Sequence, residues 1–274
     1  MKRIAAVVWV AACTYHNPKP QYAQPQPMQQ PPAQQHAVAT RPAPPVQSKV
    51  QEPAPPPKPA DEPLPVPIDQ DMPKQSVTTD AKLELGAETT ITLDARSDIY
   101  SAGDKKADVT RQGVMPSTIT LAKGGGIISF PKVSGKAACV EAAGTDADGG
   151  DCAGGDTDLL PAGKLSGIKH HQRTMFLVGV FLGAKLPAKA PATLDFSAEA
   201  TGTKFAKLEP VLGQVFYIGD GKPGDPPGDT HDFVVPKGAT RLCLGYADGF
   251  GFQGTPGAYG DNKGGLSVTV LQRK

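Results

Sequence analysis

The stretch Phe176-Leu177-Val178-Gly179-Val180-Phe181-Leu182 decides the fold class, because it carries no polar side chain at any position. A strand with one face in water alternates apolar and polar residues, whereas a strand buried on both faces does not. The stretch is also rich in β-branched and aromatic residues. It therefore predicts a central β-strand covered on both sides.

Other short segments of the same character precede and follow this stretch. Each is rich in β-branched or aromatic residues and is bounded by Gly, Pro or Asp, which indicates strands separated by turns. No segment of twelve or more residues shows a helical period. The sequence therefore predicts an all-β fold, an antiparallel β-sandwich of the jelly-roll or galactose-binding-like kind. Its further strands are expected at residues 89–93, 118–121, 126–130, 193–196, 213–218, 232–235, 241–246 and 266–270.

Proline and glycine divide the chain into two parts. Eighteen of the 29 prolines lie within residues 18–73, whereas the first glycine is Gly86 and all nine Phe lie at or after Phe130. A Pro/Gln-rich segment cannot bury enough apolar surface to offset chain entropy. We therefore predict a disordered Pro/Gln-rich spacer over residues 13–76 and a β-sandwich domain over residues 77–274. As an alternative, the spacer is a docking strip for proline-recognition domains.

The N-terminus has the character of an export signal. Met1-Lys2-Arg3 is cationic, residues 4–12 are apolar or small, and Cys13 follows Val10-Ala11-Ala12. This order resembles the bacterial lipobox. The resemblance implies a lipoprotein signal peptide over residues 1–12, lipidation of Cys13 by acyl chains such as palmitate, and, with Thr14 after the Cys, a place at the outer membrane of the cell envelope. The alternative is a chance cysteine after a cleavable secretory signal or after an ordinary apolar start.

Several function classes lack support in the sequence. A formal net charge of +1 supplies no sustained basic field for nucleic acid. No apolar run reaches the ~18 residues of a membrane span, so a membrane contact would be made through the lipid anchor alone. Nucleophile-elbow, P-loop, zincin and Cys-x-x-Cys motifs do not occur, and the chain is therefore expected not to be an enzyme.

The cysteines predict one disulfide. If Cys13 is lipidated, Cys139, Cys152 and Cys243 remain. Cys139 and Cys152 flank a Gly/Asp-rich loop and are the favoured pair in an oxidising compartment. Cys243, inside an expected strand, is interpreted as a small buried apolar residue.

The loop between the last two expected strands gathers hard oxygen donors. Asp248, Asp261 and Asn262 offer side-chain oxygens, and the surrounding glycines allow the backbone to turn its carbonyls inward. Oxygen ligands of this kind are what Ca²⁺ requires. The alternative is a solvated turn in which Asp and Asn serve turn chemistry alone.

Residues 241–270 resemble the C-terminal end of the PA-IL type galactophilic lectins, which are calcium-dependent β-sandwich proteins. The motifs that carry the likeness are Tyr246-Ala247-Asp248 and Pro256-Gly257-Ala258-Tyr259-Gly260-Asp261-Asn262. The resemblance implies Ca²⁺ as cofactor, held by the Asp248 carboxylate, the Ala258 carbonyl and the side chains of Asp261 and Asn262. It also implies that sugar hydroxyls complete the calcium shell.

The same loop suggests sugar contacts. The resemblance also implies that Asp248 and Asp261 accept hydrogen bonds from sugar hydroxyls, and Tyr259 lies within the same motif. Phe250 and Phe252 are candidates for an aromatic face under a pyranose ring. Alternatively, these two rings pack the excursion of residues 249–255 onto the sandwich. The family's Asn is replaced here by Asp261, and the family's sugar-recognising His and Gln have no counterpart within residues 156–165.

Three further groups of polar residues lie outside this loop. The acidic segment of residues 146–158 is either a second cation site or a flexible loop closed by the disulfide, and the second interpretation is favoured. The stretch 217–232 is a stiff loop that either borders the ligand site or only connects strands. His170 and His171 have no Cys, Asp or Glu at metal-ligand spacing nearby, and adjacent His residues on a strand point to opposite faces, so the two cannot easily bind one ion.

These features together predict a non-catalytic, calcium-dependent carbohydrate-binding domain, displayed on the cell envelope by a lipid anchor and a Pro-rich stalk. Its partner would be a glycan or surface polysaccharide. The alternative is a non-catalytic structural or protein-interaction lipoprotein module in which calcium, if it binds, only orders the last loop.

Overall fold

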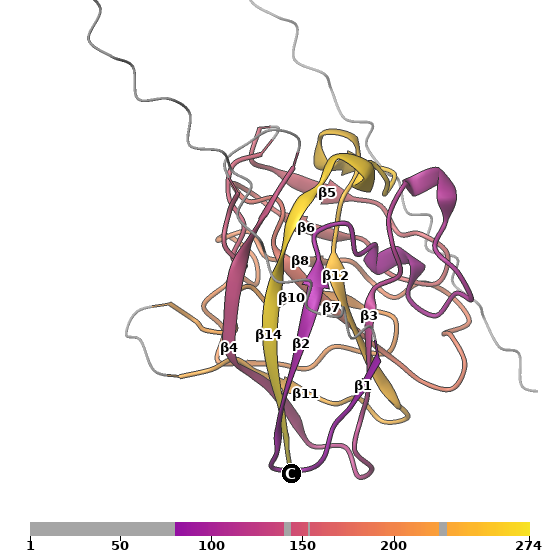
Figure 1. Ribbon diagram of the computed structural model, residues 1–274, viewed down its shortest axis with the longest axis vertical. Helices are drawn as coiled ribbons and strands as arrows, with labels where there is room; N and C mark the ends of the chain where they lie inside the picture. The colour runs from indigo at the N-terminus through magenta and orange to yellow at the C-terminus, as the bar shows by residue number, and fades with distance from the viewer. Residues whose placement is uncertain (1–79, 140–143, 153, 225–228) are drawn as a thin grey trace, which may run out of the picture. The chain divides into compact units, whose positions relative to one another are not determined.

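The computed structural model describes residues 80–139, 144–152, 154–224 and 229–274 (Figure 1). The chain divides into two units, Met1–Val66 and Pro67–Lys274, and all described residues belong to the second. The signal peptide, Cys13 and the spacer predicted up to residue 76 lie outside the described residues.

The described part of the chain is built from three mixed β-sheets and contains no α-helix. The first sheet contains β7, whose every residue is buried, and β7 is paired with β12 on one side and β10 on the other. The prediction of a strand covered on both sides is confirmed. The strands of this sheet, in spatial order, are β1 (Asp80–Lys82), β3 (Ser117–Thr120), β12 (Arg241–Tyr246), β7 (Leu177–Leu182) and β10 (Val215–Tyr217).

The second sheet is organised around the two longest strands of the described chain, β4 and β14. They pair antiparallel over most of their length, and β14 also pairs antiparallel with β2 (Figure 1). The spatial order is β2 (Glu88–Asp94), β14 (Lys263–Arg273), β4 (Ile127–Ala138), β11 (Asp232–Val234) and β9 (Lys207–Leu208).

The third sheet consists of short strands. Its order is β13 (Gln253–Gly254), β5 (Thr157–Leu159), β6 (Ile168–His170) and β8 (Leu194–Asp195). Four 3₁₀ turns complete the described elements: η1 (Ile99–Ser101), η2 (Val109–Arg111), η3 (Phe250–Phe252) and η4 (Tyr259–Asp261). No helix of the described residues is long and apolar enough to cross a membrane.

All nine predicted strands are present, but the pairing is not purely antiparallel. The pairs β1–β3, β11–β9, β13–β5 and β6–β8 are parallel, and each includes an outermost strand of its sheet. These outermost strands are only two or three residues long. Each is separated by a long connection from the strand it joins, so no hairpin forces an antiparallel direction.

Aromatic side chains link the two larger sheets. The rings of Phe216 in β10 and Phe233 in β11 lie 5.1 Å apart, and Phe233 meets Phe130 of β4 edge-on at 5.5 Å. Both distances suit favourable aromatic pairs. Cys243 of β12 is buried with a free thiol, in agreement with its interpretation as a core residue.

Candidate functional site

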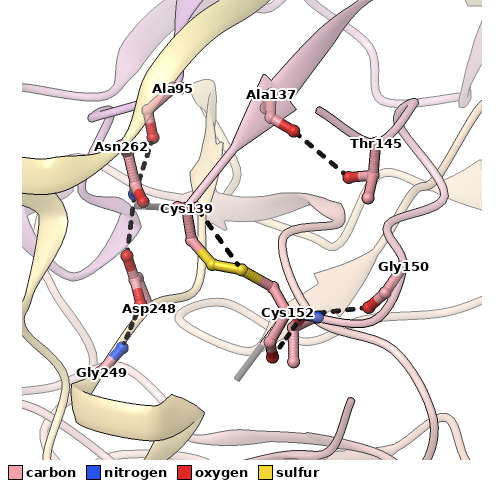
Figure 2. Close-up of a disulfide and its surroundings, with 10 residues drawn as sticks. Ala95, Ala137, Cys139, Thr145, Gly150, Cys152, Asp248, Gly249 and Asn262 are labelled. Carbon is pink, nitrogen blue, oxygen red and sulfur yellow. Dashed lines mark hydrogen bonds between the residues drawn. A yellow bond between two sulfur atoms is a disulfide. The ribbon is translucent and has the colours of Figure 1, made fainter. Parts of the chain in front are cut away.

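Three segments that are distant in the sequence meet at one end of the second sheet. Ala95 directly follows β2, Asp248 lies just beyond β12, and Asn262 directly precedes β14. Gly265 of β14 pairs with Asp94 of β2, which brings the end of one strand beside the start of the other. Figure 2 shows Ala95, Asn262, Asp248 and Gly249 joined by a continuous row of hydrogen bonds.

Asp248 is a buried carboxylate, only 2% exposed. Its Oδ1 accepts from the backbone N–H of Gly249 at 2.6 Å, and its Oδ2 accepts from Nδ2 of Asn262 at 2.8 Å. Burial raises the pKa of the Asp248 carboxyl to about 7, against the lowering effect of these two hydrogen bonds. No basic side chain pairs with this carboxylate among the described residues, so its charge is only partly compensated.

Asn262 lies between two oxygen atoms. Its Nδ2 donates to Oδ2 of Asp248 at 2.8 Å and to the carbonyl of Ala95 at 3.2 Å. Its Oδ1 is buried and has no hydrogen-bond partner among the described residues. A buried amide oxygen without a partner is costly. The Asn262 amide thus has an unused acceptor within a group of oxygen atoms.

Tyr259 holds the loop that carries Asp248. It is fully buried, its hydroxyl donates to the carbonyl of Tyr246 at 2.9 Å, and the same hydroxyl accepts from the backbone N–H of Asp248 at 3.2 Å. The chain thereby returns from η4 to the end of β12. Tyr259 therefore acts on Asp248 by positioning it and offers no exposed surface to a ligand.

The other two predicted cation ligands, Ala258 and Asp261, lie in different environments. Ala258 adopts φ +64, an uncommon left-handed backbone conformation, immediately before η4. Asp261 is exposed, and its negative charge is one cause of the raised pKa of Asp248. Both residues thus lie in the loop around Asp248, and only Asn262 shares a direct hydrogen bond with it.

The two Phe residues of the excursion separate into different environments. Phe252 is 2% exposed, so it packs the excursion onto the domain, whereas Phe250 is 91% exposed. The excursion itself is held by β13, which pairs with β5. Of the two rings, Phe250 alone presents an aromatic face to solvent.

A buried ion pair near this loop was not predicted from the sequence. Asp98 is fully buried, and its Oδ2 accepts from Nε of Arg111 and from Oγ of Ser101, both at 2.6 Å. An isolated β-bridge also joins Asp98 to Tyr246. Arg111 compensates Asp98 and leaves Asp248 without a cation. A spacing rule could not reveal this pair, because Asp98 and Arg111, thirteen residues apart, are brought together only by the fold.

The cysteine pair forms one wall beside the site. The sulfur atoms of Cys139 and Cys152 lie at disulfide distance, and their Cα atoms are 6.5 Å apart (Figure 2). Lys263 of β14 pairs with Ala138 of β4, so the adjacent residues Asn262 and Cys139 are neighbours as well. The covalent link therefore fixes the chain next to Asn262.

The acidic segment of residues 146–158 is hydrogen-bonded to the stretch 217–232. Oδ1 of Asp148 accepts from the hydroxyl of Tyr217 at 2.9 Å and from the backbone N–H of Asp220 at 2.8 Å. Burial, followed by the charge of Asp148, raises the pKa of the Asp220 carboxyl. The structure thus joins the two polar loops, at residues 146–158 and 217–232, that the sequence presents as separate.

The groups around Asp248 are of a chemical type that can bind a hard cation. A carboxylate, an amide and a backbone carbonyl, from Asp248, Asn262 and Ala95, are all oxygen donors of the type that Ca²⁺ prefers. Among the described residues, no three His, Cys, Asp or Glu side chains form a metal-binding group. A cation at this position would therefore depend on amide and backbone oxygens as much as on carboxylates.

Three comparisons with known proteins found no match for this chain, neither to a family model, nor to a curated protein, nor to a solved structure.

Proposed function

We propose that the β domain is a non-catalytic, calcium-dependent carbohydrate-binding module. The observation that carries this proposal is the buried Asp248–Asn262 pair, with a carboxylate that lacks a cation and an amide oxygen that lacks a donor. Asp248, Asn262 and Ala95 offer oxygen atoms, which are the type of ligand that a calcium ion binds. A bound Ca²⁺ would supply the missing positive charge and an electrophilic centre for ligand oxygens.

The charge balance around Asp248 supports a cation. Burial disfavours an isolated carboxylate, and the negative charges of Asp261 and Asp98 disfavour it further. Nδ2 of Asn262 lies between Oδ2 of Asp248 and the Ala95 carbonyl, two oxygens that would be among the ligands of a cation. The O and N positions of an amide can be exchanged by rotation of the amide group. In the exchanged orientation, Oδ1 of Asn262 would face the same ion.

Sugar recognition is supported by the exposed parts of the same loop. Asp261 is exposed beside Asn262, and Phe250 presents its ring at the end of the excursion. Vicinal hydroxyls can bind a calcium ion while a carboxylate accepts their protons, and an aromatic ring can cover the apolar face of a pyranose. The resemblance of residues 241–270 to galactophilic lectins points to the same chemistry.

A second candidate function is a structural or protein-interaction module in which calcium only orders the last loop. The burial of Asp248, Tyr259 and Asn262 favours it, because these side chains already hold the loop to β12 and β14. The two functions make different predictions. The first requires calcium to stabilise the domain and a glycan that binds in the presence of calcium, whereas the second requires neither and allows calcium to stabilise the domain without any glycan.

We also propose that the two five-stranded sheets form the layers of a jelly-roll or galactose-binding-like sandwich. The contact between Phe216 and Phe233, one from each sheet, supports face-to-face packing. The lipobox-like sequence at Cys13 and the Pro-rich segment after it support display on the cell envelope through a lipid anchor, with the outer membrane as the expected site.

The test uses the full chain with Cys13→Ala, which removes the lipid site. Thermal unfolding and a glycan array are measured with Ca²⁺ and with a chelator. We expect Ca²⁺ to raise Tm in the parent and in Asp104→Asn, an exposed acidic residue away from the loop, but not in Asp248→Asn. We also expect at least one glycan signal that the chelator removes.

The outcomes separate the candidates. A calcium shift in Tm without any chelator-sensitive glycan signal would favour the structural module. If Tm of the parent does not respond to calcium at millimolar concentration, the cation site is wrong and the carbohydrate proposal loses its basis.

A further inference from the structure

Residues 198–205 form a strap on the surface between β8 and β9. None of them is buried, and they form no strand or helix. The two ends of the strap are fixed, because Oγ of Ser197 accepts from the backbone N–H of His171 and β9 pairs with β11. The strap is one wall of a cavity of about 620 Å³, and residues 170–173 form another. This cavity keeps its shape only while the strap stays in place.

Between its ends, the strap is held to the domain through Phe205. The backbone amides of residues 200–202 bond only to residues 195 and 197, directly before the strap. Among the described residues, one hydrogen bond joins the strap to a distant part of the chain, between the Phe205 carbonyl and Nδ1 of His231. The Phe205 ring is also stacked on His231, with ring centroids 4.1 Å apart. His231 is therefore the anchor of the strap.

The anchor is a buried titratable group. His231 is fully buried directly before β11. Because a carbonyl can only accept, Nδ1 carries the hydrogen of the bond to Phe205, and Nε2 of the neutral ring is unprotonated. Nε2 is buried and has no hydrogen-bond partner in the described part of the chain. A proton on Nε2 would put a positive charge and an unpaired N–H into this position, which is costly.

The groups around His231 offset this cost only in part. Burial lowers the pKa of the imidazole, and the backbone of Phe205, the charge of Asp148 and the backbone of Lys222 oppose it. Asp148 is itself engaged, because its Oδ1 accepts from the Tyr217 hydroxyl and from the backbone N–H of Asp220. The other charged side chains on the strap, on the loop after β10 and around the start of β11 are exposed or half-buried: Glu199, Lys204, Asp220, Lys222, Asp229 and Asp232.

We propose that the strap is an acid-sensitive device, closed while His231 is neutral and released when His231 is protonated, so that acid opens the cavity. Release would expose the apolar surface between Phe205 and Phe196, whose ring centroids lie 5.9 Å apart in the closed form. The device shares no residue with the Asp248 loop and does not rest on the function proposed for that loop.

The direction of the pH response follows from the two states of the imidazole. In the open strap the ring meets water and regains its ordinary pKa of 6.5, whereas in the closed strap its pKa is lower. The closed form is therefore fully stable above about pH 6.5 and loses stability as pH falls below that value. Uptake of one proton raises the ratio of open to closed strap about tenfold for each pH unit in this range.

The experiment is amide hydrogen exchange, measured by NMR on the full chain with Cys13→Ala in the presence of a chelator. Each rate is divided into the intrinsic rate of an unprotected amide at the same pH. We expect the protection factors of Ala200, Thr201 and Gly202 to fall about tenfold between pH 7.5 and 5.5, while those of β7 and β12 do not fall. Constant protection in the strap, or an equal fall in β7, would overturn the proposal.

Histidine variants identify the responsible group. His231→Gln keeps an N–H that can bond to the Phe205 carbonyl, and His231→Phe keeps a ring that can stack, but neither titrates. Protection in the strap should be independent of pH in both. His171→Gln, at a side chain that is 68% exposed beside the same cavity, should respond like the parent.

His170 is a second buried histidine and needs its own control. Its Nδ1 donates to the carbonyl of His171, and it forms no hydrogen bond to the strap among the described residues. His170→Gln should therefore keep the tenfold change. If the change persists in both His231 variants, or is lost in His170→Gln, then His231 is not the switch and the proposal fails.

Discussion

Asp248 determines how the protein should respond to pH. Its carboxyl has an ordinary pKa of 3.8 and a pKa of about 7 in the folded chain, mainly because it is buried. A pKa raised by folding means that the folded state binds the proton more tightly than the unfolded state. Without calcium, the contribution of this group to stability is complete below about pH 4 and is lost as pH rises through 7.

The first prediction compares the parent with Asp248→Asn in a chelator. Between pH 4 and 7 the parent should lose about 2–4 kcal/mol of unfolding free energy relative to the variant, because the variant cannot ionise at this position. Urea unfolding at pH 4, 5, 6, 7 and 8 measures the difference. The unfolding free energy of the control variant Asp104→Asn should change with pH in parallel with that of the parent. Parallel curves for the parent and Asp248→Asn would show that Asp248 is not the group responsible.

The second prediction contrasts two buried tyrosines. The Tyr259 hydroxyl bonds to the Tyr246 carbonyl and to the Asp248 N–H, whereas the Tyr100 hydroxyl is buried without a partner among the described residues. Tyr259→Phe should therefore cost about 1–3 kcal/mol, and Tyr100→Phe should be neutral or stabilising. Chemical denaturation of both variants tests this, and equal losses would contradict the assigned role of the Tyr259 hydroxyl.

At the residue scale, the sequence located part of the candidate site and missed another part. Asp248 and Asn262 were found from their residue types and motif, and the structure joins them by a direct hydrogen bond. Ala95 was not found, because a backbone carbonyl leaves no trace in residue type. Phe250 and Phe252 were equivalent candidates, and only their burial, 91% against 2% exposed, distinguishes them.

At the scale of elements, long strands with strong apolar patterns were predictable. β7 and β12 match their predicted segments closely, because uninterrupted apolar residues report burial directly. Strands β9 and β13, of two residues each, have no such pattern and form only because neighbouring backbone is already in place. Their parallel direction could not be predicted for the same reason.

The third prediction concerns the interior of β7. A Cβ added at Gly179 would lie 2.8 Å from Cζ of Phe216 and 2.9 Å from Cδ1 of Ile218. Gly179→Ala should therefore destabilise the domain by about 1–3 kcal/mol through overpacking. Gly257→Ala is a matched control, because nothing lies within 4 Å of its added Cβ. Equal stability of the two variants would mean that β7 and β10 pack less tightly than the structure has them.

At the scale of the whole molecule, amino-acid composition divides the chain into a Pro-rich N-terminal part and a C-terminal part that carries the glycines, and no single motif marks this boundary as clearly. The aromatic residues that build the core, from Tyr100 to Tyr259, all belong to the part of the chain that carries the glycines. Every described strand lies within residues 80–273, so the three described sheets are built by the C-terminal part of the chain. Stability should therefore reside entirely in the C-terminal part.

The last prediction is that a fragment of residues 77–274 unfolds cooperatively, with Tm within about 2 °C of the full chain carrying Cys13→Ala. A loss of 1 kcal/mol would shift Tm by about 2–4 °C in a domain of this size, so even one missing contact of ordinary strength is detectable. Calorimetry of both proteins in the same chelator-containing buffer makes the comparison. A lower Tm in the fragment would show that residues before 77 pack onto the sheets, which a free stalk could not do.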